Sequence, residues 1–180
     1  MDDLGDTADD AAEPTSEVEA ETPEQTDDAD SPLLEDDATG GEDEAADLVN
    51  EVSTDLGLET APEVSYADLP EGQWGGYNRS RNSIEISNSA TLPENRESLE
   101  DTVAHELRHA YQHQESEKFL SGGAADLHAS EWADNFDNYK DFYQLLAETG
   151  DRNEAFTEYS EQPIEADAFG YEKEFRSRTR

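Results

Sequence analysis

His105-Glu106-Leu107-Arg108-His109 is the stretch of sequence from which the fold of this chain can be inferred. Two histidines that are four residues apart lie one above the other on the same face of an α-helix. Both imidazoles can therefore reach one metal ion at about 2.0–2.1 Å without distorting the helix. Glu106 is rotated by about 100° from His105, so its carboxylate lies beside such a metal. The pattern predicts a helix with two metal ligands and an adjacent acid.

The residues around this stretch also favour a helix. Ser98 suits the start of a helix, with Asp101 three residues further on. Apolar residues then recur at helical spacing, which predicts a buried stripe formed by Leu99, Val103, Ala104, Leu107, Ala110 and Tyr111. The alternative is a surface helix that carries its histidines by chance.

A catalytic zinc site uses three protein ligands and leaves one position for water, so a third ligand must come from elsewhere in the chain. His113 is the nearest candidate, but three histidines spaced four apart on one straight helix cannot converge on one ion. Glu165 is the better candidate, because Pro163 suits the first turn of a new helix. Ala168 on that helix would allow close packing on the first helix. The alternative is that Glu165 is an ordinary solvated acid.

The His-Glu-x-x-His pattern at 105–109, followed by the Tyr…Pro-x-Glu-x-x-Ala segment at 159–168, resembles the gluzincin type of zincin metallopeptidase. More narrowly, it is similar to small phage- and plasmid-associated zincin domains, including regulators that cleave phage-type repressors. The resemblance covers residues 64–176, and its specific part consists of the two short motifs. It implies an α+β zincin-like fold, in which a small antiparallel sheet packs on an active-site helix and a second, ligand-bearing helix.

The resemblance further implies that Zn²⁺ binds to His105, His109 and Glu165 and that Glu106 is the general base. The expected reaction is hydrolysis of a peptide bond in a protein or peptide substrate by a metal-activated water. The alternative function is a non-catalytic, zincin-shaped binding or structural module of a phage, virus or mobile element, with a purely structural metal.

Tyr159 precedes the third-ligand segment, and zincins often use a tyrosine or histidine to stabilise the oxyanion of the tetrahedral intermediate. Tyr159 is therefore a candidate catalytic residue. Tyr171 and His113 are alternatives for the same role, and each of the three could instead be a packing residue.

Two residues depart from the pattern of this group. Arg108 occupies a motif position that is usually uncharged. Phe169 stands four residues after the ligand glutamate, where thermolysin-like enzymes have an acid that orients a ligand histidine. Asp167 is close by, but we expect it to point elsewhere. The partner that orients the histidines is thus left open.

Two further segments bear on the fold. Ile84 and Ile86 alternate with polar residues in Ser83–Ser87, which predicts a half-buried strand that pairs with Gln73–Asn78 as a hairpin. Asp126–Glu148 is expected to be helical, with an aromatic-rich face that forms mostly core rather than a substrate platform. Ser121–Ala124 is expected to be a flexible junction that could form a lid or the rim of a cleft.

The chain is strongly acidic, with 48 Asp and Glu against 11 Lys and Arg in 180 residues, which gives a formal net charge of −37. No basic residue precedes Arg79, and the first part has little apolar surface. We therefore expect residues 1–44 to be a disordered acidic tail and residues 45–180 to be the zincin-like domain, beginning with a short helix over Ala45–Leu58.

This charge argues against nucleic acid or an anionic membrane as a partner. The tail could be a solvating or regulatory arm that covers the cleft, or it could mimic a polyanion. Alternatively, the whole protein could be adapted to high salt, which the acids throughout the folded part and the presence of only three lysines favour.

The sequence has no cysteine, so neither disulfides nor thiolate metal ligands are expected. We find no secretory signal and no apolar run of the length that a membrane span needs. A cytoplasmic location is expected, with association with a virion or mobile element as the resemblance implies.

Overall fold

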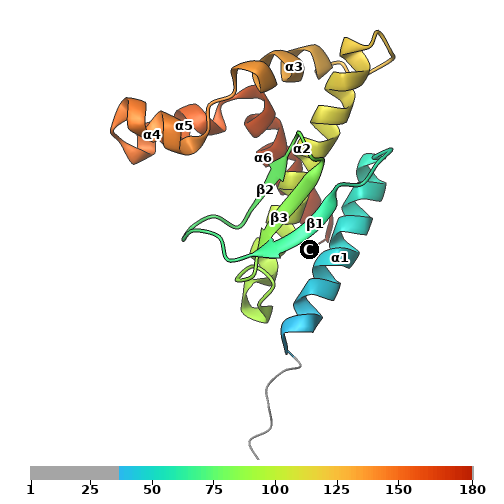
Figure 1. The fold of residues 1–180 in the computed structure, drawn as a ribbon, viewed down its shortest axis with the longest axis vertical. Coiled ribbons are helices and arrows are strands. Elements are labelled where there is room, and N and C mark those ends of the chain that lie inside the picture. Colours follow the sequence, from blue (N-terminus) through green and yellow to red (C-terminus); the bar gives the residue numbers. More distant parts are fainter. Residues whose placement is uncertain (1–36, 180) are drawn as a thin grey trace, which may run out of the picture. The chain divides into compact units, whose positions relative to one another are not determined.

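The computed structural model describes residues 37–179 of the chain, with their side chains from Gly41 onward. The α+β class is confirmed (Figure 1). The elements are α1 (Asp37–Leu56), β1 (Glu63–Ala67), β2 (Gly75–Asn78), β3 (Ser83–Ser87), a 3₁₀ turn at Pro93–Asn95, α2 (Arg96–Leu120), α3 (Ala129–Asn138), α4 (Phe142–Thr149), α5 (Arg152–Ser160) and α6 (Pro163–Thr179). The tail prediction concerns mainly residues outside the described part, and α1 begins at Asp37 rather than at Ala45.

The three strands form a mixed sheet in the order β1-β3-β2. The predicted hairpin is confirmed, because β2 pairs antiparallel with β3 and Tyr77 lies opposite Ile84. The expectation of a wholly antiparallel sheet is wrong, because β1 pairs parallel with β3, with Val64 opposite Ile84. The connection from β1 to β2 passes β3, which leaves β3 in the centre and β2 at an edge of the sheet.

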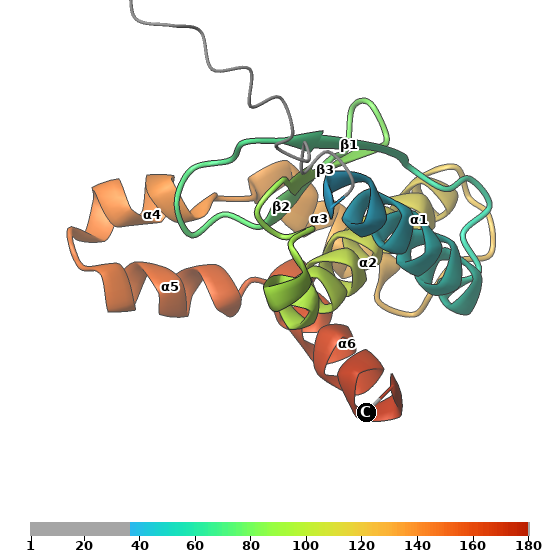
Figure 2. The same cartoon turned by 90° about the horizontal axis from the view of Figure 1, so that it is seen from below.

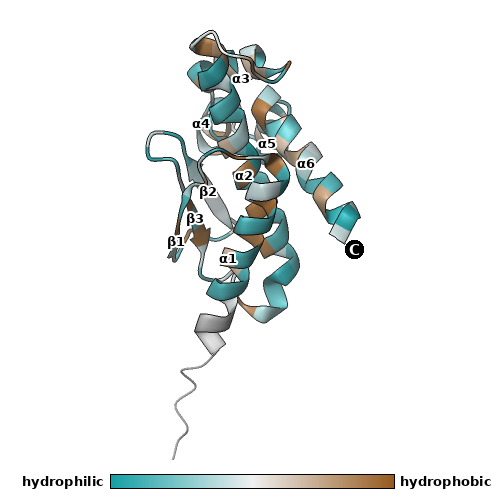
Figure 3. Cartoon of the chain, turned by 90° about the vertical axis from the view of Figure 1, so that its right-hand side faces the viewer, coloured by the Kyte–Doolittle hydropathy of each residue, from teal (hydrophilic) through white to brown (hydrophobic). Residues whose placement is uncertain are grey.

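Helices α1 and α2 cover one face of the sheet (Figure 2). Ile84 and Ile86 point toward them and are fully buried, whereas Glu85 between them is exposed, as the alternation predicts. Apolar residues of α1 recur at helical spacing and complete the core together with α2, namely Ala45, Leu48, Val49 and Val52. In Figure 3, hydrophobic residues are coloured along the stretches of helix and strand that face one another, and most of the remaining ribbon is hydrophilic.

Helix α2 starts earlier than the sequence pattern indicates. Pro93 opens a 3₁₀ turn and Asn95 takes the capping position, so Ser98 lies inside the helix and the predicted Ser98 cap is wrong. The helix ends at Leu120, where Gly122 adopts φ 78° and its amide donates to the Phe119 carbonyl. A left-handed residue of this kind commonly ends a helix.

The segment Asp126–Glu148 is broken into two helices rather than continuous. Tyr139 is extended, with φ −61° and ψ 136°. Asp141 then begins α4 through a capping box. The Asp141 side chain accepts from the backbone amide of Gln144, and the Gln144 side chain accepts from the backbone amide of Asp141. This local capping competes with continuation of the helix.

Helices α4 and α5 form a hairpin that packs mainly on itself and reaches the other helices through α5 against α6. Gly150 in the left-handed region and the Asp151 cap make the tight connection between them. At the base of the hairpin, Gln162 bonds both backbone groups of Lys140, accepting from its amide at 3.0 Å and donating to its carbonyl at 2.8 Å. None of the helices in residues 37–179 is long and apolar enough to cross a membrane.

Strand β2 lies close against α2 at Gly75. A Cβ atom on Gly75 would lie 2.6 Å from Thr102 Cγ2 and 3.1 Å from the Glu85 carbonyl oxygen. On Gly76, the nearest such atom would be Gln73 Nε2 at 3.8 Å. The glycine at position 75 therefore sets how closely the edge strand approaches the helix that carries His105.

Gly75→Ala should lower the free energy of unfolding by about 1–3 kcal/mol, because the added methyl group overpacks the β2–α2 contact. Gly76→Ala is the matched control and should cost less, since its methyl group has room. Urea denaturation of both variants checks this. Equal losses of stability would show that the close approach at Gly75 is not required.

Candidate metal centre

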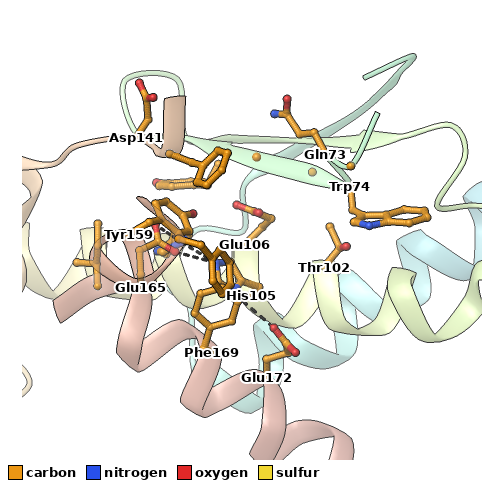
Figure 4. Close-up of a pocket in the computed structure, with 18 of the residues that line it drawn as sticks. Gln73, Trp74, Thr102, His105, Glu106, Asp141, Tyr159, Glu165, Phe169 and Glu172 are labelled. Carbon is orange, nitrogen blue, oxygen red and sulfur yellow. Dashed lines mark hydrogen bonds and ion pairs between the residues drawn. The ribbon is translucent and has the colours of Figure 1, made fainter. Parts of the chain in front are cut away.

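The site lies between α2 and the first turn of α6 (Figure 4). His105 and His109 project from α2, and Glu165 projects from α6 toward them. All three side chains are buried, and Glu165 is only 1% exposed. The fully buried Ala168 is a small residue on α6, which packs directly on α2. The structure thus brings together the three residues that the sequence predicts as metal ligands.

The three side chains converge on one point. His105 Nε2 lies 3.1 Å from His109 Nε2 and 3.2 Å from Glu165 Oε2, and His109 Nε2 lies 3.6 Å from Glu165 Oε1. A tetrahedral zinc ion about 2.0–2.1 Å from each ligand atom would separate those atoms by about 3.3 Å. The spacing therefore fits a first-row metal, and this cluster could hold one.

Gln112 decides which nitrogen of His109 faces the cluster. Its Nε2 donates to the Ile164 carbonyl at 2.9 Å and to Asp167 Oδ2 at 2.7 Å, and both of these atoms are acceptors. Its Oε1 therefore faces His109 Nδ1, 2.9 Å away, and can only accept from it. His109 thus carries its proton on Nδ1 and turns the lone pair of Nε2 toward His105 and Glu165.

Glu172 faces Nδ1 of His105, as Gln112 faces Nδ1 of His109. Its Oε2 lies 3.6 Å from His105 Nδ1, and its other oxygen accepts from Arg176 at 2.9 Å. Phe169 occupies the position where thermolysin-like enzymes place an acid, and its ring packs edge-on against His105 with centroids 4.6 Å apart. The carboxylate that faces His105 is therefore one helical turn further along α6 than the resemblance implies.

Arg108 and Asp167 hold the Gln112 side chain in position. Asp167 accepts two bonds from Arg108, at 2.7 and 3.0 Å, and so reaches His109 through Gln112 rather than pointing elsewhere. The Arg108 guanidinium also lies over the rings of Tyr111, Trp132 and Tyr171. The bidentate pairing with Asp167 thus explains why an arginine stands at this motif position, which is usually uncharged.

The electrostatic field of the cluster favours a positive charge between its members. Burial disfavours the charged form of His105, but the bonds with Glu165 and Glu172 and the charge of Glu106 outweigh it and raise the pKa of His105 to about 10. Burial likewise disfavours the Glu165 carboxylate, but its hydrogen bond with His105 outweighs the burial and holds the pKa of Glu165 well below the ordinary range.

Two tyrosines complete the surroundings of Glu165. Tyr139 donates to Glu165 Oε1 at 2.8 Å, and Tyr159 lies beside the same carboxylate (Figure 4). Burial, followed by the charge of Glu165, raises the pKa of both phenols, which keeps them protonated and able to donate. The sequence does not indicate Tyr139 as a site residue, because it lies within a segment expected to be continuous helix.

The alternatives to Tyr159 lie elsewhere. Tyr171 donates to Asp55 at 2.7 Å, and His113 Nδ1 lies 2.8 Å from the Tyr77 hydroxyl. Neither of them lines the cleft beside the cluster, whereas Tyr159 does.

A cleft of about 960 Å³ opens beside the cluster. Residues 72–77, which lead into and form most of the edge strand β2, line one side, and the α4–α5 hairpin lines the other. Glu106 points into this space (Figure 4). The junction 121–124 is not among the lining residues, so the predicted role as rim is wrong.

The expectation that the aromatic face of Asp126–Glu148 forms mostly core is only partly correct. Trp132 and Leu145 are buried, as expected of core residues, but Leu127 is 97% exposed. Phe136, Tyr139, Phe142 and Tyr143 line the cleft. They form part of its wall because the break at Tyr139 turns α4 away from the direction of α3.

Gln112→Leu should weaken zinc binding about 10–100-fold, because His109 loses the acceptor that fixes its tautomer. Gln114→Leu, on the same helix but outside the cluster, is the control and should leave the affinity unchanged. Titration against a chromogenic chelator measures both, and circular dichroism verifies that the helices are intact. Unchanged zinc affinity in a folded Gln112→Leu protein would contradict the tautomer assignment.

Zinc affinity should continue to rise with pH well above about pH 7, where sites built from ordinary histidines level off. Zinc must displace the proton of His105, whose pKa is raised to about 10, so the competent form grows as pH approaches that value. Chelator competition across this pH range tests the expectation. A plateau near pH 7 would show that His105 is already neutral there.

Comparisons of the chain with models of protein families, with curated proteins and with solved structures find no match.

Proposed function

We propose that this protein is a zinc-dependent metallopeptidase that hydrolyses peptide bonds with Glu106 as general base. The observation that carries the proposal is the position of Glu106, which faces the cleft next to the buried His105, His109 and Glu165 cluster. Imidazole and carboxylate ligands without cysteine suit zinc, and also other first-row metals. The substrate class that we propose is a protein or peptide.

A zinc ion in this cluster would polarise the carbonyl group of a bound peptide and lower the pKa of water toward about 7. Glu106 accepts the proton from the attacking water and passes it to the leaving amine. Tyr159 and Tyr139, which burial keeps protonated, can donate a hydrogen bond to the oxygen on which negative charge develops. Tyr159 is the residue of this chain that the resemblance to zincins suggests for this role, and Tyr139 is a second donor beside it.

The edge strand supports an extended substrate. Because β2 lies at the edge of the sheet and lines the cleft, its outer backbone groups can pair with a peptide laid alongside it. Gly75 and Gly76 have no side chains that would keep the peptide backbone away. The scissile bond would then lie between β2 and Glu165, within reach of Glu106.

The alternative, a binding module with a structural metal, predicts a closed site with four protein ligands. The cluster found among the described residues has three members and borders an open cleft. This arrangement favours the catalytic function.

Glu106→Gln should retain one zinc per chain and lose about 10²–10⁴-fold in turnover, because the amide cannot accept the proton. His109→Ala should lose the metal itself. Glu117→Gln, an exposed position on the same helix, is the matched control for both properties. Mass spectrometry gives the metal content, and cleavage of fluorescent casein gives the turnover.

Full turnover by Glu106→Gln would rule out the general-base role. A wild-type protein that holds stoichiometric zinc and cleaves no polypeptide would instead indicate the binding module.

A further inference from the structure

The carboxylates that line the cleft are, apart from Glu106, engaged within the protein. Asp101 pairs with Arg176, and Asp141 caps α4 by accepting from the Gln144 amide. Glu172 faces His105 and also pairs with Arg176, and Glu165 belongs to the cluster. These acids therefore have little capacity left to neutralise a further cation in the cleft.

Two arginines that line the same cleft are placed differently. The Arg79 guanidinium lies over the Phe136 ring, 5.3 Å from its centroid, and that of Arg152 lies over Phe142 at 5.4 Å. Arg79 is 3.8 Å from exposed Asp137, a separation at which an ion pair contributes little. None of the ion pairs found among residues 41–179 involves Arg152. Stacking on a ring holds each guanidinium while leaving its N–H groups at the edge free.

This arrangement is unusual among the bases of the chain. Most of the others bond to carboxylates of the protein, namely Arg96, Arg108, Lys118, Lys140, Arg176 and Arg178. With 48 acids against 11 bases in the sequence, a carboxylate partner is easily found. Two cleft arginines that face rings instead are available to bind a ligand.

The wall of the cleft is also rich in aromatic side chains. Those nearest the two arginines and the mouth of the cleft come from β2 and the segment before it, from α3 and from the α4–α5 hairpin, and are Trp74, Tyr77, Phe136, Phe142, Tyr143 and Phe156. Tyr143 and Phe156 remain 60% and 52% exposed, although they are large and apolar. Exposed apolar surface that gathers in a groove is typical of a ligand-binding site.

We propose that this cleft selects a polypeptide segment in which a large apolar or aromatic side chain is flanked by Asp or Glu. The apolar side chain packs on the aromatic wall, and the Arg79 and Arg152 guanidinium groups bind the flanking carboxylates. Within an otherwise acidic chain, the two arginines point to this occupant, because arginine pairs with carboxylates through two parallel hydrogen bonds. The proposal rests on the proposed peptidase function for the cleavage of the segment, but its binding can be measured without cleavage.

The test uses the full-length Glu106→Gln protein loaded with zinc and short fluorescent peptides with acetylated and amidated ends. Each peptide has a central phenylalanine flanked by Glu, by Gln or by Lys, and a fourth has alanine between Glu residues. The Glu-flanked phenylalanine peptide should bind about tenfold more tightly than its Gln counterpart, and the Lys and alanine peptides should be weaker still.

The arginines are tested by combining Arg79→Gln with Arg152→Gln in the same protein. This change should abolish the preference for Glu over Gln. Arg81→Gln is the matched control, since it lies in the same turn as Arg79 but does not line the cleft, and it should leave the preference intact. Equal affinity for the Glu and Gln peptides, or a preference that survives the double change, would overturn the proposal.

Failure of this inference differs from failure of the peptidase function. Wild-type protein that cleaves the peptides at equal rates whatever their flanking residues contradicts the inference alone. Arginine-dependent binding of the Glu peptide without any cleavage contradicts the peptidase function alone.

Discussion

Three electron-pair donors face one point between α2 and α6, and the rest of the structure serves to hold them there. The Gln112 amide is fixed by two acceptors, so His109 must turn an unprotonated nitrogen toward His105 and Glu165. Donors brought to 3.1–3.6 Å in a buried place repel one another unless a cation lies between them. A proton on His105 can serve as that cation, and a metal ion does so better because it bonds all three.

The fold provides this convergence by packing two helices closely. Ala168 is a small residue on α6, and the bidentate Arg108–Asp167 pair links the two helices next to the cluster. On the other side of α2, Gly75 brings the edge of the sheet to Glu106. Helix α2 therefore carries His105, His109 and the proposed general base Glu106, while α6, which supplies Glu165, and β2, the proposed peptide-binding edge, both pack against it.

Residues with local partners could largely be predicted from the sequence, whereas most residues with distant partners could not. The spacing of His105 and His109 predicts their side of α2, and the alternation at Ile84 and Ile86 predicts the hairpin. Glu165 could be proposed because Pro163 marks the start of its helix. The parallel pairing of β1 depends on a connection that passes β3, for which no short-range pattern exists.

The same distinction applies within the site. Gln112 and Glu172 act across the α2–α6 interface, and their roles follow from the packing of helices whose facing residues are far apart in sequence. Glu172 could be placed near the ligand face of its helix by spacing alone, but its partner could not. The position of Tyr139 beside Glu165 could not be predicted, because the capping box of Asp141 with Gln144 breaks a segment whose apolar spacing suits one helix.

The way in which the α4–α5 hairpin is attached bears on how this protein can diverge. Its base is closed by the paired bonds between Gln162 and Lys140, and its own side chains supply Phe142, Tyr143 and Phe156 to the cleft but no member of the metal cluster. Substitutions of these three residues can change what the cleft accepts without altering the cluster on α2 and α6. Tyr159 of the same hairpin is the exception, because it lies beside Glu165. Under the proposed function, the part of the hairpin away from Tyr159 is therefore where variants with new preferences should be sought.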